Sequence, residues 1–197
     1  MTAVPLRSIA ELMPLLPELV LVGGAFALLM LDLFLSEQRR VAIHWLSIAL
    51  LVVVAAMVAS GTGGQGTVLG GMFVRDGVAD VLKASLAGIS AIAMVFLWPY
   101  MSDRGLYKGE MSVLMLFAVL GMMLLVSSGS LVMIYVGLEM LALCSYALVA
   151  IDRENPLASE AGIKYFVLGA LASEASGLSR SIATSAYEHS ASISRPT

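Results

Sequence analysis

Long apolar runs separated by short polar connections make up most of the chain. Most of these runs approach the roughly 20 residues that an α-helix needs to cross about 30 Å of hydrocarbon. The pattern therefore predicts an all-α protein, a polytopic transmembrane helical bundle with about six membrane segments. We expect these segments at residues 13–35, 41–59, 77–101, 111–126, 131–151 and from residue 158 onward.

The sixth segment is shorter than the others. Its apolar part, residues 158–172, would form about 22 Å of helix, less than the ~30 Å of the hydrocarbon core. The serine-rich stretch SEASGLSRSIATSAYEHSASISRPT then replaces the apolar pattern. A chain rarely stops inside a span, because its backbone end would be unsatisfied in lipid. We therefore expect an incomplete sixth helix.

Composition supports the membrane assignment and limits the chemistry. Of the 197 residues, 59% are hydrophobic and only 13% are charged, whereas a soluble domain carries about 25% charged residues. The single cysteine, Cys144, excludes disulfides within the chain and cysteine-ligated iron–sulfur clusters. The two histidines, His44 and His189, lie far apart in the sequence. We expect no cofactor bound by this chain, the lipid bilayer as its surroundings, and no nucleic-acid partner.

Lysine and arginine are distributed unequally between the two sets of connections. Loops after odd-numbered segments hold five of them, against two in the N-terminus and the other loops. Positive charge is retained on the cytoplasmic side of membranes. The N-terminus is thus predicted on the outer side. The five are Arg39, Arg40, Arg104, Lys108 and Arg153, and the two are Arg7 and Arg75.

A glycine-rich stretch, SGTGGQGTVLGG, joins the second and third segments. Three of its glycines, Gly61, Gly63 and Gly66, have the GxGxxG spacing of dinucleotide sites. That motif requires a strand before it and a helix N-terminus after it. Because this stretch connects two membrane helices, we interpret it as a flexible loop.

Two charged residues lie within the apolar sequence and are the candidate functional residues. Glu139 is near the middle of the fifth segment, and Lys164 is just inside the sixth. An ionisable side chain at membrane depth costs several kcal/mol unless it is paired or hydrated, so it is a functional candidate. Residues three or four apart share a helix face, so Tyr135 and Tyr146 should lie on the same side as Glu139.

Structural roles for these residues remain open. Lys164 follows Glu160 at i, i+4, so it could pair with Glu160 near the interface and extend towards water. Glu139 could be a protonated carboxyl hydrogen-bonded between helices. Two further polar residues are expected at the membrane interface: Lys83, within a turn of Asp80, and His44, beside Trp45.

The run MIYVGLEMLALCSYALVAIDRENPLASEAGIKYFVLGALAS resembles the fifth and sixth helices of the antiporter-like membrane subunits of proton-pumping NADH:quinone oxidoreductase, respiratory complex I. Within that family the resemblance is strongest to subunit N. The stretches LLPELVLVGGAFALLMLDLF and GMFVRDGVADVLK resemble the same subunit. The resemblance covers residues 10 to 173 and implies the N-terminal part of an antiporter-like fold.

By this resemblance Glu139 matches the fifth-helix glutamate whose charge is modulated by lysines, and Lys164 matches a sixth-helix lysine. Residues 1–110 would form an N-terminal three-helix region, and residues 111–173 the start of the proton-channel repeat. Residues 174–197 would be a serine-rich tail outside the family. The implied role is a non-redox membrane subunit that couples electron transfer from NADH to quinone to proton translocation. NADH, flavin, iron–sulfur clusters and quinone would belong to the rest of the complex, in a bacterial cytoplasmic membrane.

Two alternatives remain. A cation/proton antiporter subunit would share the chemistry of the fifth and sixth helices. A truncated or frame-shifted copy of either protein would be non-functional, because the family's further lysines lie beyond the sixth helix.

Overall fold

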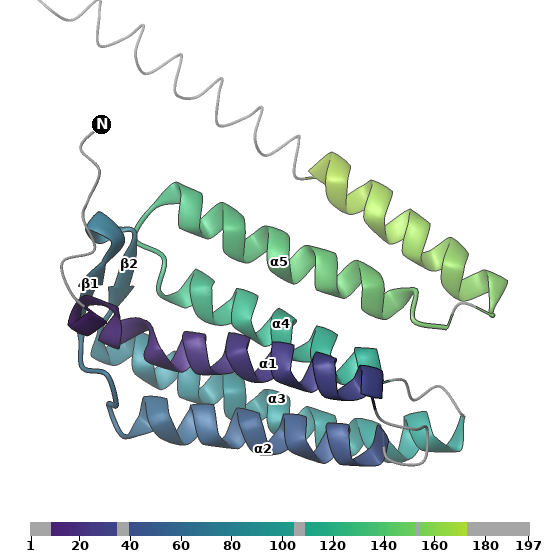
Figure 1. The fold of residues 1–197 in the computed structure, drawn as a ribbon. Coiled ribbons are helices and arrows are strands. Elements are labelled where there is room, and N and C mark those ends of the chain that lie inside the picture. Colours follow the sequence, from purple (N-terminus) through teal and green to yellow (C-terminus); the bar gives the residue numbers. More distant parts are fainter. Residues whose placement is uncertain (1–8, 35–39, 105–108, 153, 173–197) are drawn as a thin grey trace, which may run out of the picture.

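The computed structural model describes residues 9–34, 40–104, 109–152 and 154–172 (Figure 1). The predicted all-α transmembrane fold is confirmed: five helices are long and apolar enough to cross a membrane. They are α1 (Leu16–Phe34), α2 (Arg40–Ala59), α3 (Gly77–Asp103), α4 (Gly109–Val126) and α5 (Leu131–Val149). A 3-10 turn, Ile9–Leu15, leads into α1. A further helix, over residues 156–172, occupies the position of the predicted sixth segment.

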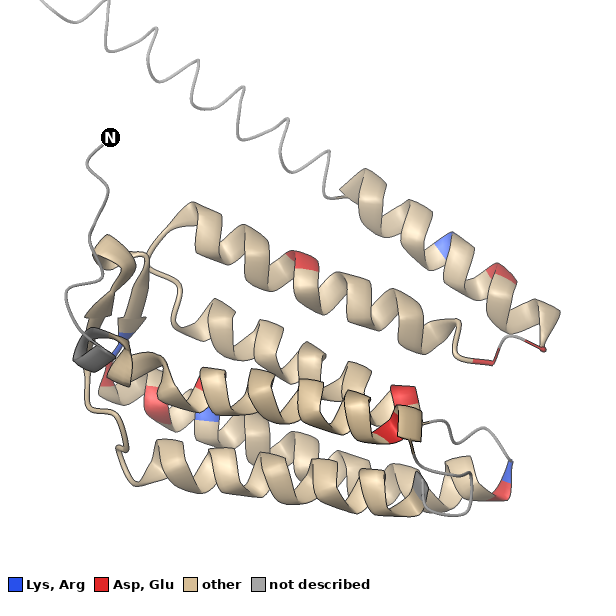
Figure 2. Ribbon diagram, in the orientation of Figure 1, with Lys and Arg blue, Asp and Glu red and all other residues tan. Residues whose placement is uncertain are grey.

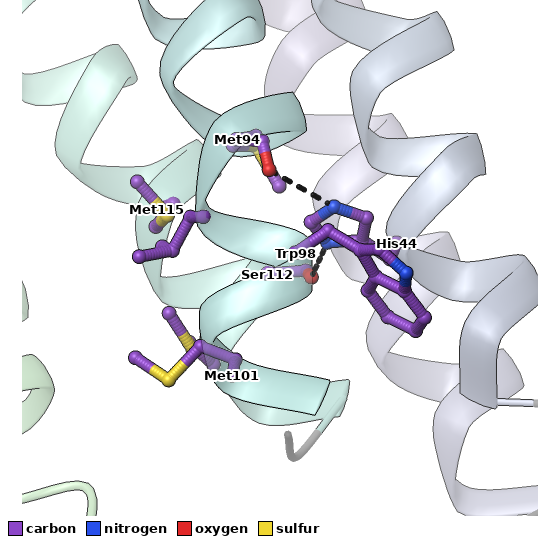
Figure 3. Close-up of a pocket in the computed structure, with 8 residues that line it drawn as sticks. His44, Met94, Trp98, Met101, Ser112 and Met115 are labelled. Carbon is purple, nitrogen blue, oxygen red and sulfur yellow. Dashed lines mark hydrogen bonds between the residues drawn. The ribbon is translucent and has the colours of Figure 1, made fainter. Parts of the chain in front are cut away.

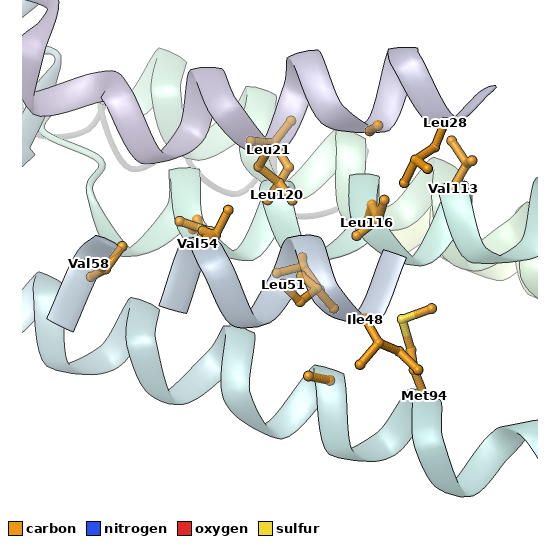
Figure 4. Packing of buried hydrophobic residues seen from close by; sticks show 14 residues of the cluster. Leu21, Leu28, Ile48, Leu51, Val54, Val58, Met94, Val113, Leu116 and Leu120 are labelled. Carbon is orange, nitrogen blue, oxygen red and sulfur yellow. The ribbon is translucent and has the colours of Figure 1, made fainter. Parts of the chain in front are cut away.

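Helices α1 to α4 form a bundle, with α4 in contact with each of the other three and with α5 (Figure 1). Lipid tails are as apolar as leucine, so such helices associate through close packing rather than through hydrophobic burial. The core of the bundle is built from branched and sulfur-containing side chains on all four helices (Figure 4). Among them are Leu21, Leu51, Val54, Met94, Leu116 and Leu120.

Two glycines bring α5 against α4. A Cβ atom on Gly121 would lie 2.9 Å from the carbonyl oxygen of Gly137, and one on Gly137 would lie 3.0 Å from that of Gly121. Small residues at a helix crossing allow the two backbones to approach closely. Beyond this contact α5 is largely uncovered: 11% of its membrane window is buried, compared with 56% for α4.

The helix at residues 156–172 packs beside α5, on the side away from the bundle (Figure 1). The ring of Tyr146 lies 5.2 Å from that of Tyr165 and 5.3 Å from that of Phe166, both in edge-to-face geometry. A Cβ atom on Gly162 would be 2.7 Å from that of Ala150. The last two helices are therefore antiparallel neighbours.

The glycine-rich connection between α2 and α3 is more ordered than a flexible loop. It contains an antiparallel hairpin of β1 (Gly66–Val68) and β2 (Phe73–Arg75), joined by a 3-10 turn at Leu69–Gly71. Gly70 and Gly71 adopt φ values of 67° and 90°, which glycine reaches without the penalty of a side chain. The prediction missed these strands because three residues each are too short to show a period-two pattern.

The hairpin also forms backbone hydrogen bonds with the connection between α4 and α5. The amide of Val74 donates to the carbonyl of Ser127 at 2.8 Å, and the amide of Gly129 donates to that of Met72 at 2.7 Å. Of the GxGxxG glycines, Gly63 makes a close backbone contact. Gly63, at φ 96°, lies directly against the carbonyl of Met13, where a Cβ atom would collide.

Candidate functional site

Glu139 lies about halfway along α5 and is its one charged residue (Figure 2). The helix begins at a cap in which the Ser130 side chain accepts a hydrogen bond from the amide of Met133 at 3.2 Å. The close contact between Gly121 and Gly137 then determines which face of α5 packs against α4, two residues before Glu139. The side chain of Glu139 is half-buried as a result.

An open groove of about 380 Å³ runs beside Glu139. Apart from the carboxylate and the phenol of Tyr135, its walls are apolar or sulfur-containing side chains of α4 and α5. They are Phe117, Val136, Met140, Leu143 and Cys144. In the described part of the chain, Glu139 makes no ion pair or side-chain hydrogen bond. The two tyrosines predicted on the same side as Glu139 have different surroundings. Tyr135 lines the groove, whereas Tyr146 is covered by the last helix.

Lys164 is paired within its own helix. Its Nζ lies 2.6 Å from Oε1 of Glu160, and the two side chains are 69% and 57% exposed. The structure therefore does not bring Lys164 to Glu139. It places Lys164 in the local i, i+4 pair that the sequence also allowed.

The most enclosed charged pair of the described chain lies elsewhere, between α1 and α3. Nζ of Lys83 lies 2.6 Å from Oε1 of Glu18, and the two side chains are 0% and 3% exposed. The expected interfacial position of Lys83 was wrong. The signal was present in the sequence, because alanines at positions 79, 87 and 91 lie four or eight residues from Lys83 and form a small-residue face suited to helix packing.

A second pair adjoins the first at the hairpin. Nε of Arg75, from β2, lies 2.6 Å from Oδ1 of Asp80. One Nη of the same guanidinium donates to the carbonyl oxygens of Thr62, at 2.8 Å, and Pro14, at 3.3 Å. Arg75 thus ties the connection after α2 and the start of α1 to α3.

His44 is also buried rather than interfacial. Its Nε2 lies 3.2 Å from the carbonyl oxygen of Met94, and its Nδ1 lies 3.2 Å from Oγ of Ser112 (Figure 3). A neutral ring with its proton on Nε2 satisfies both contacts, because a carbonyl can only accept. The ring of Trp98 lies 4.9 Å away, nearer than that of Trp45 at 6.1 Å. The prediction was wrong because α2 is apolar all round, so its pattern does not show which face is buried.

The arrangement can hold and exchange protons, but it offers no evident seat for a metal. Among residues 9–34, 40–104, 109–152 and 154–172, no group of three or more metal-ligating side chains comes together. The cavity beside His44, about 10 Å³ in volume, is close to the smallest that holds one water. Within the described residues, the titratable groups brought together at these sites are carboxylates, ammonium groups and the imidazole of His44.

Comparisons with known proteins agree on one family. Residues 128–181 match the family model described as NADH:quinone oxidoreductase/Mrp antiporter, TM. NADH-quinone oxidoreductase subunit N of Xanthomonas euvesicatoria pv. vesicatoria (strain 85-10) is 59% identical over 172 residues, 87% of this chain and 35% of the relative. The corresponding protein of Laribacter hongkongensis (strain HLHK9) is 45% identical over 164 residues, 83% of this chain and 34% of the relative.

A solved structure shares the fold. A chain of respiratory complex I from Thermus thermophilus, solved with bound aureothin, superposes with a TM-score of 0.62 at 28% identity, over 79% of this chain and 33% of that one. This chain spans about a third of the length of the relatives it matches. Over that third, it is similar to the NADH-quinone oxidoreductase subunit N proteins and to a membrane chain of respiratory complex I.

Proposed function

We propose that the chain acts as part of a membrane subunit N of a proton-translocating NADH:quinone oxidoreductase. In this role it carries no electrons. NADH, flavin, iron–sulfur clusters and quinone are held by the other subunits, and the other membrane subunits are its partners. The complex lies in a bacterial cytoplasmic membrane, with the N-terminus of this chain on the outer side. Impermeant labelling of cysteines placed at Gln65 and Asn155, in a Cys144→Ala background, tests that orientation: only Gln65→Cys should react from outside.

Glu139 is the proton-coupling carboxylate in this proposal, and Lys164 is a second charged group of the same pathway. Bringing an ammonium and a carboxylate together in a low-dielectric interior changes the proton affinity of both. Making or breaking such a pair therefore loads or releases a proton. Lys164 would have to leave Glu160 to take part.

One observation supports this role most directly. Glu139 is a half-buried carboxylate halfway along a membrane helix, beside an otherwise apolar groove. Among the described residues it has no charged partner comparable to Lys83, which pairs with Glu18. An ionisable group at membrane depth is costly to keep and is usually retained for a function.

The test is a Glu139→Gln substitution in a complex that contains this chain. We expect assembly and electron transfer to continue while the number of protons moved per electron falls. Glu154→Gln is the matched control, because it removes an exposed carboxylate outside both the groove and the Lys164 pair. An unchanged proton-to-electron ratio in Glu139→Gln would sink the assignment, and absence of the tagged chain from the purified complex would overturn the subunit role.

A cation/proton antiporter subunit is the second candidate, because the matching family model covers Mrp antiporters as well. Deleting the gene separates the two. Sodium-sensitive growth with normal NADH oxidation would favour the antiporter, whereas loss of NADH-driven proton export would favour the oxidoreductase.

A further inference from the structure

The described part of the chain contains two lysine–glutamate pairs with the same Nζ–Oε1 distance, 2.6 Å. Lys164–Glu160 is exposed and lies within one helix, whereas Lys83–Glu18 joins two helices and is almost completely buried. Both carboxylate oxygens of Glu18 and the Nζ of Lys83 are out of reach of solvent. Taking two charges out of water in this way is expensive, and their mutual attraction has to offset that cost.

The pair is surrounded by one aromatic ring and two charged side chains. Nζ of Lys83 lies 4.6 Å from the centroid of the Phe73 ring, which attracts the ammonium form. The neighbouring charges are the guanidinium of Arg75, from β2, and the carboxylate of Asp80, from α3. Along the described parts of α2 and α4, the titratable groups lie at the opposite end of each helix. The formal charges of this cluster of Glu18, Arg75, Asp80 and Lys83 cancel, and Asp76, an exposed carboxylate at the N-cap of α3, is a further acidic group at the hairpin end.

A hollow of about 550 Å³ reaches this cluster from the hairpin end. It lies between the end of α2, the glycine-rich connection and the start of α3, and its polar lining includes Ser60, Gln65, Asp80 and Ser85. The side chain of Asp80 is 14% exposed. Asp80 therefore belongs both to the hollow and to the buried cluster, one helical turn before Lys83.

We propose that Lys83 and Glu18 form a proton-exchange site that the hollow connects to water through Asp80. Release breaks an Nζ–H bond of Lys83 and passes the proton to the Asp80 carboxylate or to water, leaving a neutral amine. Arg75 remains as the positive charge of the cluster. Uptake is the reverse reaction. This site deepens the proposed function, because it would give the subunit a proton port at its hairpin end.

The chain suits a direct test, because it contains three lysines: Lys83, Lys108 and Lys164. The full chain, with Lys108→Arg and with Nζ of the remaining lysines labelled with ¹⁵N, is placed in lipid nanodiscs and titrated by NMR. We expect the Lys83 signal to change from ammonium to amine across a pH range in which the Lys164 signal stays ammonium. A Lys83 signal that remains ammonium as long as that of Lys164 would overturn the proposal and leave the pair as a structural latch.

Two variants test the route through the hollow. Ser85→Leu fills the hollow from an exposed position and should slow proton exchange at Lys83 at least tenfold without changing its end states. Asp80→Asn removes the carboxylate and should slow it similarly. Unchanged exchange in the folded Ser85→Leu chain would overturn the route. These readouts need no partner subunit, so a failed assembly experiment would refute the subunit role alone.

Discussion

The bundle of α1 to α4 and the arm formed by α5 and the last helix place their charged side chains in opposite environments. In the bundle, Lys83 and Glu18 are sealed between helices. On the arm, Lys164 and Glu160 face outward, and Glu139 borders an open groove. The two ion pairs have the same length, so distance does not distinguish them. Burial does: an exposed pair contributes roughly 0–1 kcal/mol, whereas breaking a buried one costs about 3–5 kcal/mol.

The largest effect is expected when one partner of the buried Lys83–Glu18 pair is removed. Lys83→Met leaves the Glu18 carboxylate enclosed without its ammonium and should lower the free energy of unfolding by about 3–5 kcal/mol. Unfolding of the purified chain by SDS in mixed micelles, followed by circular dichroism, measures the change. Lys164→Met is the matched control. Equal losses in the two variants would show that burial is not what separates the pairs.

Removing both charges of the buried pair should restore most of the free energy of unfolding that Lys83→Met loses. Replacing a buried ion pair by uncharged groups of similar volume is often neutral or stabilising. We expect Glu18→Gln with Lys83→Met to unfold within about 1 kcal/mol of the unchanged chain. The same SDS titration tests this, and a double variant as weak as Lys83→Met would argue that the charges position Phe73 or Arg75 in some further way.

A glycine substitution can separate the arm from the bundle without touching any charge. Gly137→Leu forces a side chain into the backbone of α4 and should cost about 1–3 kcal/mol through overpacking. The single cysteine, Cys144, is 7% exposed on α5, so its rate of maleimide labelling reports undocking of the arm. Labelling should accelerate in Gly137→Leu but not in Gly23→Ala, where a Cβ atom would meet nothing within 4 Å.

The smallest effect is expected at the exposed pair. Glu160→Gln should change the free energy of unfolding by less than about 0.5 kcal/mol, because solvent and side-chain entropy offset the attraction. Raising the salt concentration should reduce even that difference. A salt-independent loss would mean that Glu160 is enclosed by something in the membrane.

Much of this architecture follows from the sequence. The runs at 77–101 and 111–126 correspond to α3 (Gly77–Asp103) and α4 (Gly109–Val126) because run length alone sets a membrane span. The depth of Glu139 follows from counting residues along α5. The buried face of α2 could not be obtained in this way, because α2 is apolar all round, and His44 was misplaced for that reason. Lys83 was misplaced although the alanines on its side of α3 indicated a packing face. For Lys164, the i, i+4 spacing allowed the pair with Glu160 without establishing it.

The hairpin has a mechanical consequence for α5. Its bonds to Ser127 and Gly129 anchor the start of the helix, while little of the bundle covers the rest. When the Gly121–Gly137 contact opens, as Gly137→Leu should make it do, the helix can pivot about the hairpin. Glu139 lies eight residues beyond Leu131, about 12 Å along the axis. A swing of about 10° would carry its backbone about 2 Å sideways and the far end of α5 about 5 Å. The connection between α2 and α3 would thereby set how far the carboxylate of Glu139 can travel.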